Sequence, residues 1–589
     1  MNMHKRYLTA FCATAAIFGS LCETEADVKM PAIFGDHMVL QQEMKLPVWG
    51  WAAAGEKVTV TVGGETEQTT AGPDGKWRVD LPPFPDGTPA VTMTVKGNNT
   101  VTFTDVLIGD VWICSGQSNM EFPLDKATGG LDEARKANDS QLRLFQVARN
   151  HAFDPQSDLV GHWALVKPAT TSTFSAVGYL KSEWGVPASA PVSTFSAVGY
   201  FFGRELRADL RRPIGLISSN WGGTPAEAWT SLSGLKKEPA LEHYADEHDL
   251  TVANYPKALA EAPARDAAWR AAVAKWQKAI GPSYGPILRK WNADVAAAKA
   301  ENRPLPPSPP PPVPKPLAPL PPDGGQKLSC VLYNGMIAPL IPYGIKGVIW
   351  YQGESNVPQA MEYRILFSRM ISDWREKWGE GNFPFLYVQL ANFFGGGYTN
   401  TDWGVLRESQ TQTLSLPKTG MAVAIDIGNP NDIHPKDKLN VGKRLALAAE
   451  HVAYGKDLVY SGPMFRGMQI HGGSARITFT QVGGGLKIGK APSVPEGFQA
   501  LPDTKLVGFF VAGADKKWSP ADAKIDGDAV VVSSGQVTQP VAVRYAFMNS
   551  PQCNLYNKEG LPASPFRTDN WVDVKVPGMR MAPPGAAAH

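Results

Sequence analysis

Hydrophobic and polar residues alternate along three short stretches near the start of the chain. Residues 57–62 read Lys-Val-Thr-Val-Thr-Val, and 76–81 and 91–95 repeat this pattern between glycine turns. Successive side chains of a strand point to opposite faces of a sheet, so the alternation predicts half-buried strands. We predict a small β-sandwich-like domain over residues 27–105, with a structural rather than a sugar-binding role.

After residue 105 the pattern changes to continuous apolar runs that alternate with segments of helical spacing. Such runs predict strands buried on both faces, and their alternation with helices predicts a mainly parallel sheet covered on both sides. The predicted strands are 106–114, 214–219, 346–352, 385–390 and 421–425. The predicted helices include 201–206, a segment from Ala226, 361–378, 403–414 and 441–451.

One stretch does not fit the alternation of strands and helices. Residues 236–302 are rich in Ala, Lys and Glu, with one helical face that carries Trp269 and Trp276 and a second helix that carries Trp291. Twelve of the nineteen residues from Pro304 to Pro322 are proline, which predicts an extended, semi-rigid spacer. We interpret 236–325 as a helical and proline-rich insertion that divides an α/β domain into 106–235 and 326–455.

Two further segments complete the pattern. The octapeptide of residues 172–179 recurs at 193–200; we interpret the second copy as structural and the first as an inserted loop. Alternation returns after residue 455, with strands at 476–480 and 529–532. This predicts a C-terminal β-rich region over 456–576 and a disordered tail over 577–589.

The N-terminus has the features of a secretory signal. Lys5 and Arg6 precede an apolar stretch that ends at about Leu21 and is too short to span a bilayer as a helix. We predict a signal peptide over 1–26 and a secreted or periplasmic protein, with lipid attachment at Cys22 as the alternative. No second membrane-spanning segment is predicted.

Composition narrows the function classes. The chain is 43% hydrophobic and 19% charged, as globular proteins are, and its net charge of +2 gives no basis for nucleic-acid binding. The cysteines beyond the signal, Cys114, Cys330 and Cys553, are too widely spaced for a metal or disulfide framework. We find no metal-ligand or phosphate-loop motif, so we expect no metal and no cofactor.

Candidate chemistry lies where the predicted strands end. Ser118 sits on a turn that begins with Gly116, directly after strand 106–114. The carboxyl ends of strands are where ligands bind in open α/β sheets, although an ordinary loop serine would look the same. Gly222-Gly223 and Gly353-Glu354 follow two other strands, and a fourth loop carries His434.

These loops supply the parts of an acyl-transfer site. A serine hydroxyl needs a base, which His434 would provide, and the imidazole needs a carboxylate, for which Asp432 and Glu354 are both candidates. A tetrahedral oxyanion needs preorganised donors. The candidate donors are the N–H groups of Ser118, Gly222 and Gly223 and the side-chain amides of Gln352 and Asn356. The candidate substrate contacts are Gln117, Asn119 and Trp221.

Several long blocks of sequence resemble one known family. The blocks 110–121, 331–339, 347–356, 432–435 and 554–567 are similar to the sialate O-acetylesterase family within the SGNH hydrolases. This resemblance implies a flavodoxin-like, three-layer catalytic domain that removes acetyl esters from sugars, with Ser118 as nucleophile and His434 as base. The family usually has Asp three residues before His, where this chain has Asn431; we therefore prefer Asp432, and Glu354 remains the alternative.

The substrate stays open at this point. The resemblance implies O-acetylated sialic acid, or acetylated hemicelluloses such as xylan and xyloglucan. Sialate would need a cation for its carboxylate, and Arg544 and Arg567 are candidates. The alternative functions are a non-catalytic glycan-binding protein and a broader carboxylesterase, lipase or peptidase on the same fold. The sequence does not indicate an oligomeric state.

Overall fold

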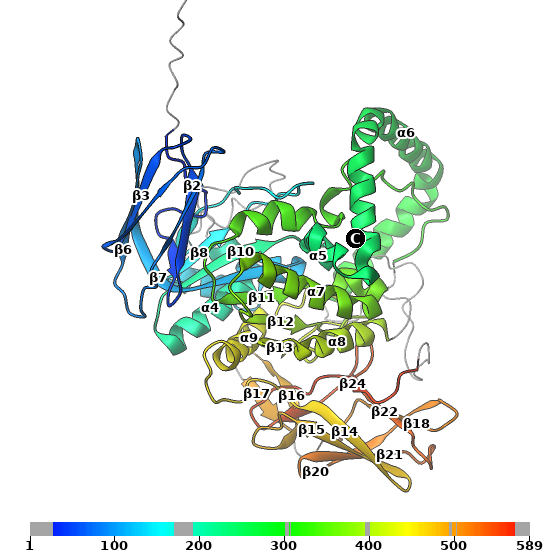
Figure 1. Cartoon of the computed structure of the whole chain (residues 1–589). Helices are drawn as coiled ribbons and strands as arrows, with labels where there is room; N and C mark the ends of the chain where they lie inside the picture. Colours follow the sequence, from blue (N-terminus) through cyan, green and yellow to red (C-terminus); the bar gives the residue numbers. More distant parts are fainter. Residues whose placement is uncertain are drawn as a thin grey trace, which may run out of the picture.

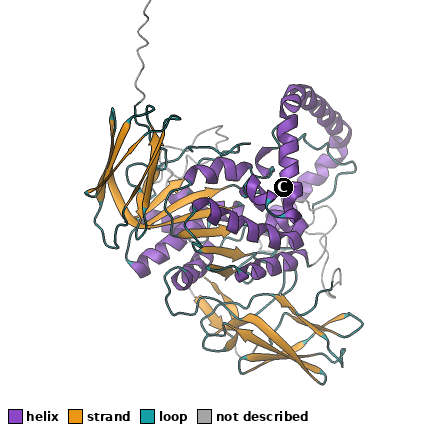
Figure 2. Cartoon of the chain, in the orientation of Figure 1, coloured by secondary structure: helices purple, strands orange, loops and turns teal. Residues whose placement is uncertain are grey.

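A computed structural model describes residues 27–169, 192–300, 306, 308–394, 401–493, 497–501 and 504–571. A large mixed sheet forms the centre, with an all-β region at one end and a second one below it (Figures 1 and 2). The predicted signal peptide, the first copy of the repeated octapeptide and the predicted tail lie outside the described residues.

One long strand, β7 (Thr100–Gly116), joins the N-terminal region to the central sheet. Its first half is antiparallel to β6 (Val91–Lys96) and alternates in exposure. From Val106 onward every residue of β7 is buried, and β7 runs parallel to β10 (Ile214–Asn220) and β11 (Gly347–Tyr351). The boundary expected between residues 105 and 106 therefore falls inside one continuous strand.

The N-terminal region contains the strands that alternation predicts, β3 (Lys57–Val62), β5 (Lys76–Leu81) and β6. β3 pairs with β4 (Glu65–Thr70) and β6, while β5 pairs with β2 (Leu46–Trp51). The inward residues of these strands, such as Val60 and Leu81, are buried. A short strand, β1 (Val39–Gln41), pairs with β7 beside the central sheet.

The central strands are ordered β13-β12-β11-β7-β10-β8-β9. All neighbours are parallel except the edge pair β8 (Asp139–Gln146) and β9 (Trp163–Val166), so the sheet is mixed rather than wholly parallel. The chain fills the β10 side of β7 first and then crosses to β11, β12 (Phe385–Gln389) and β13 (Thr419–Val423). The carboxyl end of β7 is therefore the topological switch point, where α/β sheets place their ligands.

Helices cover both faces of this sheet. Trp112 of β7 contacts Phe202 of α4 (Ala197–Leu210), which packs on α9 (Lys438–Val452). Trp350 of β11 contacts Phe367 of α7 (Ala360–Trp378). Trp350 pairs with Ser115, three positions after Trp112, so the two tryptophans point to opposite faces.

The remaining helices near the sheet are shorter. α8 (Asp402–Gln412) packs on α7, and α2 (Gly130–Lys136) precedes β8. The second copy of the octapeptide leads into α4. The helix predicted from Ala226 is instead a 3₁₀ turn over Ala226–Trp229, followed by the one-turn helix α5 (Leu232–Lys236).

The insertion forms a hairpin of one helix and one extended arm. The prediction of two helices is wrong, because α6 is continuous over Glu242–Ala300. Four internal prolines each remove a backbone hydrogen bond, and α6 curves along its length (Figure 1). Side chains along α6 donate to backbone carbonyls of the arm: Trp269 to Pro316, Trp276 to Val313, Tyr284 to Pro309 and Trp291 to Pro306.

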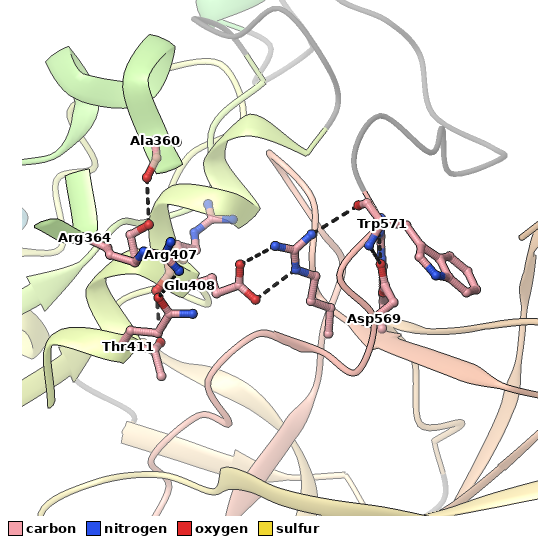
Figure 3. A network of polar contacts seen from close by, with 11 residues as sticks. Ala360, Arg364, Arg407, Glu408, Thr411, Asp569 and Trp571 are labelled. Carbon is pink, nitrogen blue, oxygen red and sulfur yellow. Dashed lines mark hydrogen bonds and ion pairs between the residues drawn. The ribbon is translucent and has the colours of Figure 1, made fainter. Parts of the chain in front are cut away.

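The C-terminal region holds two four-stranded antiparallel sheets and one three-stranded sheet. One contact with the central domain is an ion pair in which Arg567 donates to both carboxylate oxygens of Glu408 on α8, at 2.9 and 2.6 Å (Figure 3). Arg544 pairs with Asp569 within the same region. The strands are β14 (Met464–His471), β15 (Ser474–Thr480), β16 (Leu486–Ser493), β17 (Gly497–Ala500), β18 (Phe509–Ala512), β19 (Trp518–Pro520), β20 (Asp522–Asp526), β21 (Ala529–Ser533), β22 (Ala542–Tyr545), β23 (Leu555–Asn557) and β24 (Phe566–Arg567).

Over the part of the chain that the structure describes, no helix combines the length and the apolar character needed to cross a bilayer.

Candidate active site

A glycine turn at the end of β7 positions Ser118. Gly116 has φ +134°, and a Cβ there would lie 2.3 Å from the carbonyl oxygen of Tyr351, so no other residue fits between β7 and β11. The next N–H, of Gln117, donates to that same carbonyl at 3.0 Å. Ser118 then opens the short helix α1 (Ser118–Glu121) at the switch point of the sheet.

Folding brings His434 to Ser118 from 316 residues away along the chain. The imidazole Nε2 lies 2.8 Å from the serine Oγ. His434 stands on the loop between β13 and α9, with its ring stacked near Phe122 at a centroid distance of 6.4 Å. A neutral imidazole in this position can accept the serine proton.

Asp432 is the carboxylate beside this imidazole. Its Oδ1 accepts the backbone N–H of His434 at 2.9 Å and lies 3.9 Å from Nδ1. The second distance is within ion-pair range but too long for a hydrogen bond. Glu354 is bonded elsewhere: its Oε1 accepts from the side-chain amide of Asn119 at 2.6 Å. Of the two carboxylates left open by the sequence, the structure thus brings Asp432 close to His434.

A buried polar network lies beneath the Ser118–His434 pair. The amide of Asn119 also donates to the carbonyl of Ile433 at 3.0 Å, next to His434. Lys438 donates to Asn119 Oδ1 at 2.5 Å, and its ammonium lies over the rings of Phe122 and Tyr351. Asn119 thereby links α1, which begins at Ser118, to the loop that holds His434.

Burial controls the charges in this network. It lowers the pKa of Lys438 to about 7, against an opposing effect of Glu354. It also raises the pKa of Glu354, whose Oε2 is buried and has no hydrogen-bond partner among the described residues. The pKa of His434 is lowered by burial and by Lys438, while Asp432 and Glu121 act in the opposite direction. The net effect favours the neutral, proton-accepting imidazole.

Gly222, the first glycine of the pair after β10, lies directly against Ser118. A Cβ added to Gly222 would be 3.2 Å from the Cβ of Ser118. The N–H of Gly222, however, donates to Glu121 Oε2 at 2.8 Å, and Glu121 forms an ion pair with Arg149. The N–H of Gly222, a predicted oxyanion donor, is therefore next to Ser118 and donates to a carboxylate in this structure.

Comparisons with known proteins identify the family of this chain. A family model described as carbohydrate esterase, sialic acid-specific acetylesterase matches residues 327–451. Human sialate O-acetylesterase is 30% identical over 583 residues, which cover 91% of this chain and 92% of the human protein. The chain belongs to the sialate O-acetylesterase family.

Two further relatives support the same fold and enzyme class for this chain. Sialate O-acetylesterase from Rattus norvegicus is 29% identical over 581 residues, 90% of this chain and 92% of the rat protein. The crystal structure of a carbohydrate acetylesterase from Xanthomonas citri is 36% identical, covers 92% of this chain and 100% of its own, and superimposes with a TM-score of 0.70. This member of the sialate O-acetylesterase family is a carboxylic ester hydrolase.

The two side-chain amides predicted as oxyanion donors, Gln352 and Asn356, have other hydrogen-bond partners in this chain. The Nε2 of Gln352 donates to Asn356 Oδ1 at 2.6 Å and to the carbonyl of Thr224 at 3.3 Å. Asn356 accepts from the N–H of Ala226 and donates to Glu227 at 2.8 Å. Both side chains are fully buried. Their hydrogen bonds hold the turns at the ends of β10 and β11 together.

The three residues predicted to contact the substrate differ in their exposure to solvent. Asn119 and Gln117 are 1% and 3% exposed, which contradicts direct contact with a sugar. The Oε1 of Gln117 accepts the N–H of Ser355 at 3.2 Å. Trp221 is half-buried, and the guanidinium of Arg149 lies over its ring.

Arg149 lies beside Trp221 although no sequence motif indicates it, and the two arginines considered for a sialate carboxylate form other ion pairs. Arg544 and Arg567 are paired within or beside the C-terminal β region. Arg149 reaches the site from the segment after β8, together with His151, whose ring meets Trp221 edge-on at 6.0 Å. These residues are in no motif, and the only available signal is that β8 lies next to β10 in the folded sheet.

Proposed function

We propose that the chain is a carbohydrate O-acetylesterase that uses Ser118, His434 and Asp432. The observation that carries the proposal is the 2.8 Å contact between Ser118 Oγ and His434 Nε2 at the sheet's switch point. The Oγ attacks the acetyl carbonyl as Nε2 takes its proton, and the imidazolium then protonates the departing sugar oxygen. Water, deprotonated by the same imidazole, releases acetate from Ser118.

The oxyanion donors of this proposal are backbone groups. The N–H of Ser118 opens α1, and the first N–H groups of a helix have no partner within it. Gly222 contributes a second N–H once the acetyl oxygen replaces Glu121, and Gly223, with φ +74°, is the remaining candidate. Gln352 and Asn356 are left out because their amides have other partners.

Trp221 is the proposed sugar contact nearest to Ser118. The charge of the neighbouring Arg149 is balanced by Glu121, which favours a neutral acetylated sugar, of the xylan or xyloglucan type, over a sialate carboxylate. We further propose that the chain is exported after removal of residues 1–26, and that residues 106–235 and 326–455 form the catalytic domain around the inserted 236–325.

Hydrolysis of p-nitrophenyl acetate by the wild type and by Ser118→Ala tests the mechanism. We expect the alanine variant to lose about 10³-fold or more in kcat. Equal rates would refute the serine esterase proposal and favour a glycan-binding protein. A rate that increases with the length of a p-nitrophenyl acyl chain would favour a lipase instead. Acetate release from acetylated xylo-oligosaccharide, xyloglucan oligosaccharide and 9-O-acetyl sialic acid, side by side, tests the sugar class.

A further inference from the structure

A cavity lies at the base of the helical insertion. Its volume is about 660 Å³, within the range of small-molecule sites. The first turns of α6 form one wall with Val252 and Ala253, Phe153 forms a second, and Ser233 and Lys377 line a third. The insertion thus contributes directly to a hollow on the catalytic domain.

Aromatic rings connect this cavity with the proposed sugar contact. Trp221 precedes Gly222, which touches Ser118. The ring of His151 meets Trp221 at 6.0 Å, and Phe153, two residues further, lines the cavity and contacts Tyr255 of α6 at 5.1 Å. The path from the nucleophile to the cavity therefore follows one short segment, residues 149–153.

Charges on the cavity wall are balanced. Lys236 pairs with Asp249 at 2.6 Å, and Lys377 donates to Ser233 Oγ at 2.8 Å. Asp154 also lines the cavity, so its lining includes two ammonium groups and two carboxylates. An anion would have to compete with these carboxylates, whereas a neutral polyol can bond to hydroxyl, ammonium and carboxylate groups alike and place its C–H faces on Phe153.

We propose that this cavity is a distal subsite for a neutral glycan chain. One part of the chain occupies the cavity while an acetylated sugar residue lies at Trp221 and Ser118. The substrate class is then an acetylated neutral oligosaccharide of several residues rather than an acetylated monosaccharide. This inference rests on the proposed esterase function.

Ala253→Trp tests the subsite, because a tryptophan on the cavity wall occupies part of the volume that a sugar would need. Ala260→Trp is the matched control, since it lies seven residues, or about two turns, further along the same face of α6 and is exposed. The assay is kcat/KM for acetylated xylo-oligosaccharides of one to six residues, divided by kcat/KM for p-nitrophenyl acetate.

For the wild type and Ala260→Trp, we expect this ratio to increase about tenfold from the shortest to the longest substrate, and we expect Ala253→Trp to abolish the increase. A ratio independent of chain length, or one that both tryptophan variants leave unchanged, would overturn the subsite. A chain-length effect confined to anionic glycans would overturn its neutral character. Calorimetric binding of unacetylated xylohexaose to Ser118→Ala and to Ser118→Ala/Ala253→Trp needs no catalysis. We expect binding only by the first, and equal binding would contradict the proposal.

Failure of the esterase proposal has a different signature. In that case the wild type would not hydrolyse p-nitrophenyl acetate faster than Ser118→Ala, whatever the oligosaccharide measurements give.

Discussion

The backbone N–H of Gly222 donates to the carboxylate of Glu121 over 2.8 Å. Both residues are next to the nucleophile, since Glu121 ends the helix that Ser118 begins and Gly222 lies against the serine Cβ. An acetyl carbonyl that uses this N–H must first replace an ionised acceptor, and hydrogen bonds to ionised acceptors are stronger than those to neutral ones. The resting site therefore has an internal competitor for its substrate.

Removal of this competitor should increase activity. For Glu121→Ala we expect kcat/KM for p-nitrophenyl acetate to rise by about tenfold, equivalent to about 1.4 kcal/mol. Glu121→Gln, which keeps a neutral acceptor, should give a smaller increase. A loss of activity in the alanine variant would show that Glu121 contributes to catalysis.

Asp432 and Glu354 should differ sharply when each is made neutral. Asp432→Asn removes the charge beside the imidazole and is expected to lower kcat by about 10²- to 10⁴-fold. Glu354→Gln retains an acceptor for Asn119 and touches no part of His434, so its kcat should stay within about tenfold of the wild type. The reverse order, measured with p-nitrophenyl acetate, would assign the triad acid to Glu354.

The pH profile should report the charges around His434. Lys438 disfavours the imidazolium, while Glu121 and Asp432 favour it. Because the base must be neutral, kcat/KM rises with pH through the pKa of His434. Lys438→Met should raise that pKa and move the acid limb to higher pH, whereas Glu121→Gln should move it to lower pH. Shifts in the same direction for both variants would contradict the assignment.

Glu227 should make stability depend on pH. Burial raises its pKa from 4.5 to about 7 in the folded chain. Its protonated form favours folding below pH 4.5, and this advantage is lost as the pH rises to 7. Between pH 4.5 and pH 7, the free energy of unfolding of Glu227→Gln should therefore rise relative to that of the wild type, by on the order of 3 kcal/mol.

Urea unfolding at pH 4.5, 6 and 7.5 measures this gain. Glu261, an exposed residue of α6, replaced by Gln, is the control and should show no such trend. A gain for Glu227→Gln that is constant across the three pH values would exclude titration of Glu227 as its cause.

The strands of this fold could be predicted because their residues alternate or stay apolar. β3 and β5 begin and end at the predicted residues, β11 is one residue shorter than predicted at each end, and β12 is one residue shorter at its C-terminal end. The continuity of β7 could not be predicted, because its first half alternates and its second half is buried on both faces, so one strand has two periodicities. The unbroken course of α6 was missed because prolines and a change of face suggested an interruption.

The site was predictable where chemistry depends on a motif. Ser118 and His434 could be paired from their residue types and loops, and the structure places them in contact. The environment of the amides could not be predicted, since Asn119, Gln352 and Asn356 have the same side-chain chemistry whether they face a substrate or a buried partner. The location of Arg149 beside the site could not be predicted for another reason. It depends on the position of β8 in the sheet rather than on the neighbouring residues in the sequence.

The hairpin of α6 and the proline arm has a consequence for how this chain can change over evolution. Its hydrogen bonds recur every seven or eight helix residues and every three or four arm residues. The spans agree, because Trp269–Trp291 covers about 33 Å at 1.5 Å per residue and Pro306–Pro316 about 31 Å at 3.1 Å. Deletion of a single helix residue would rotate all later donors by about 100° away from the arm. Homologous insertions should therefore vary in whole repeats, with helix and arm lengthened or shortened together.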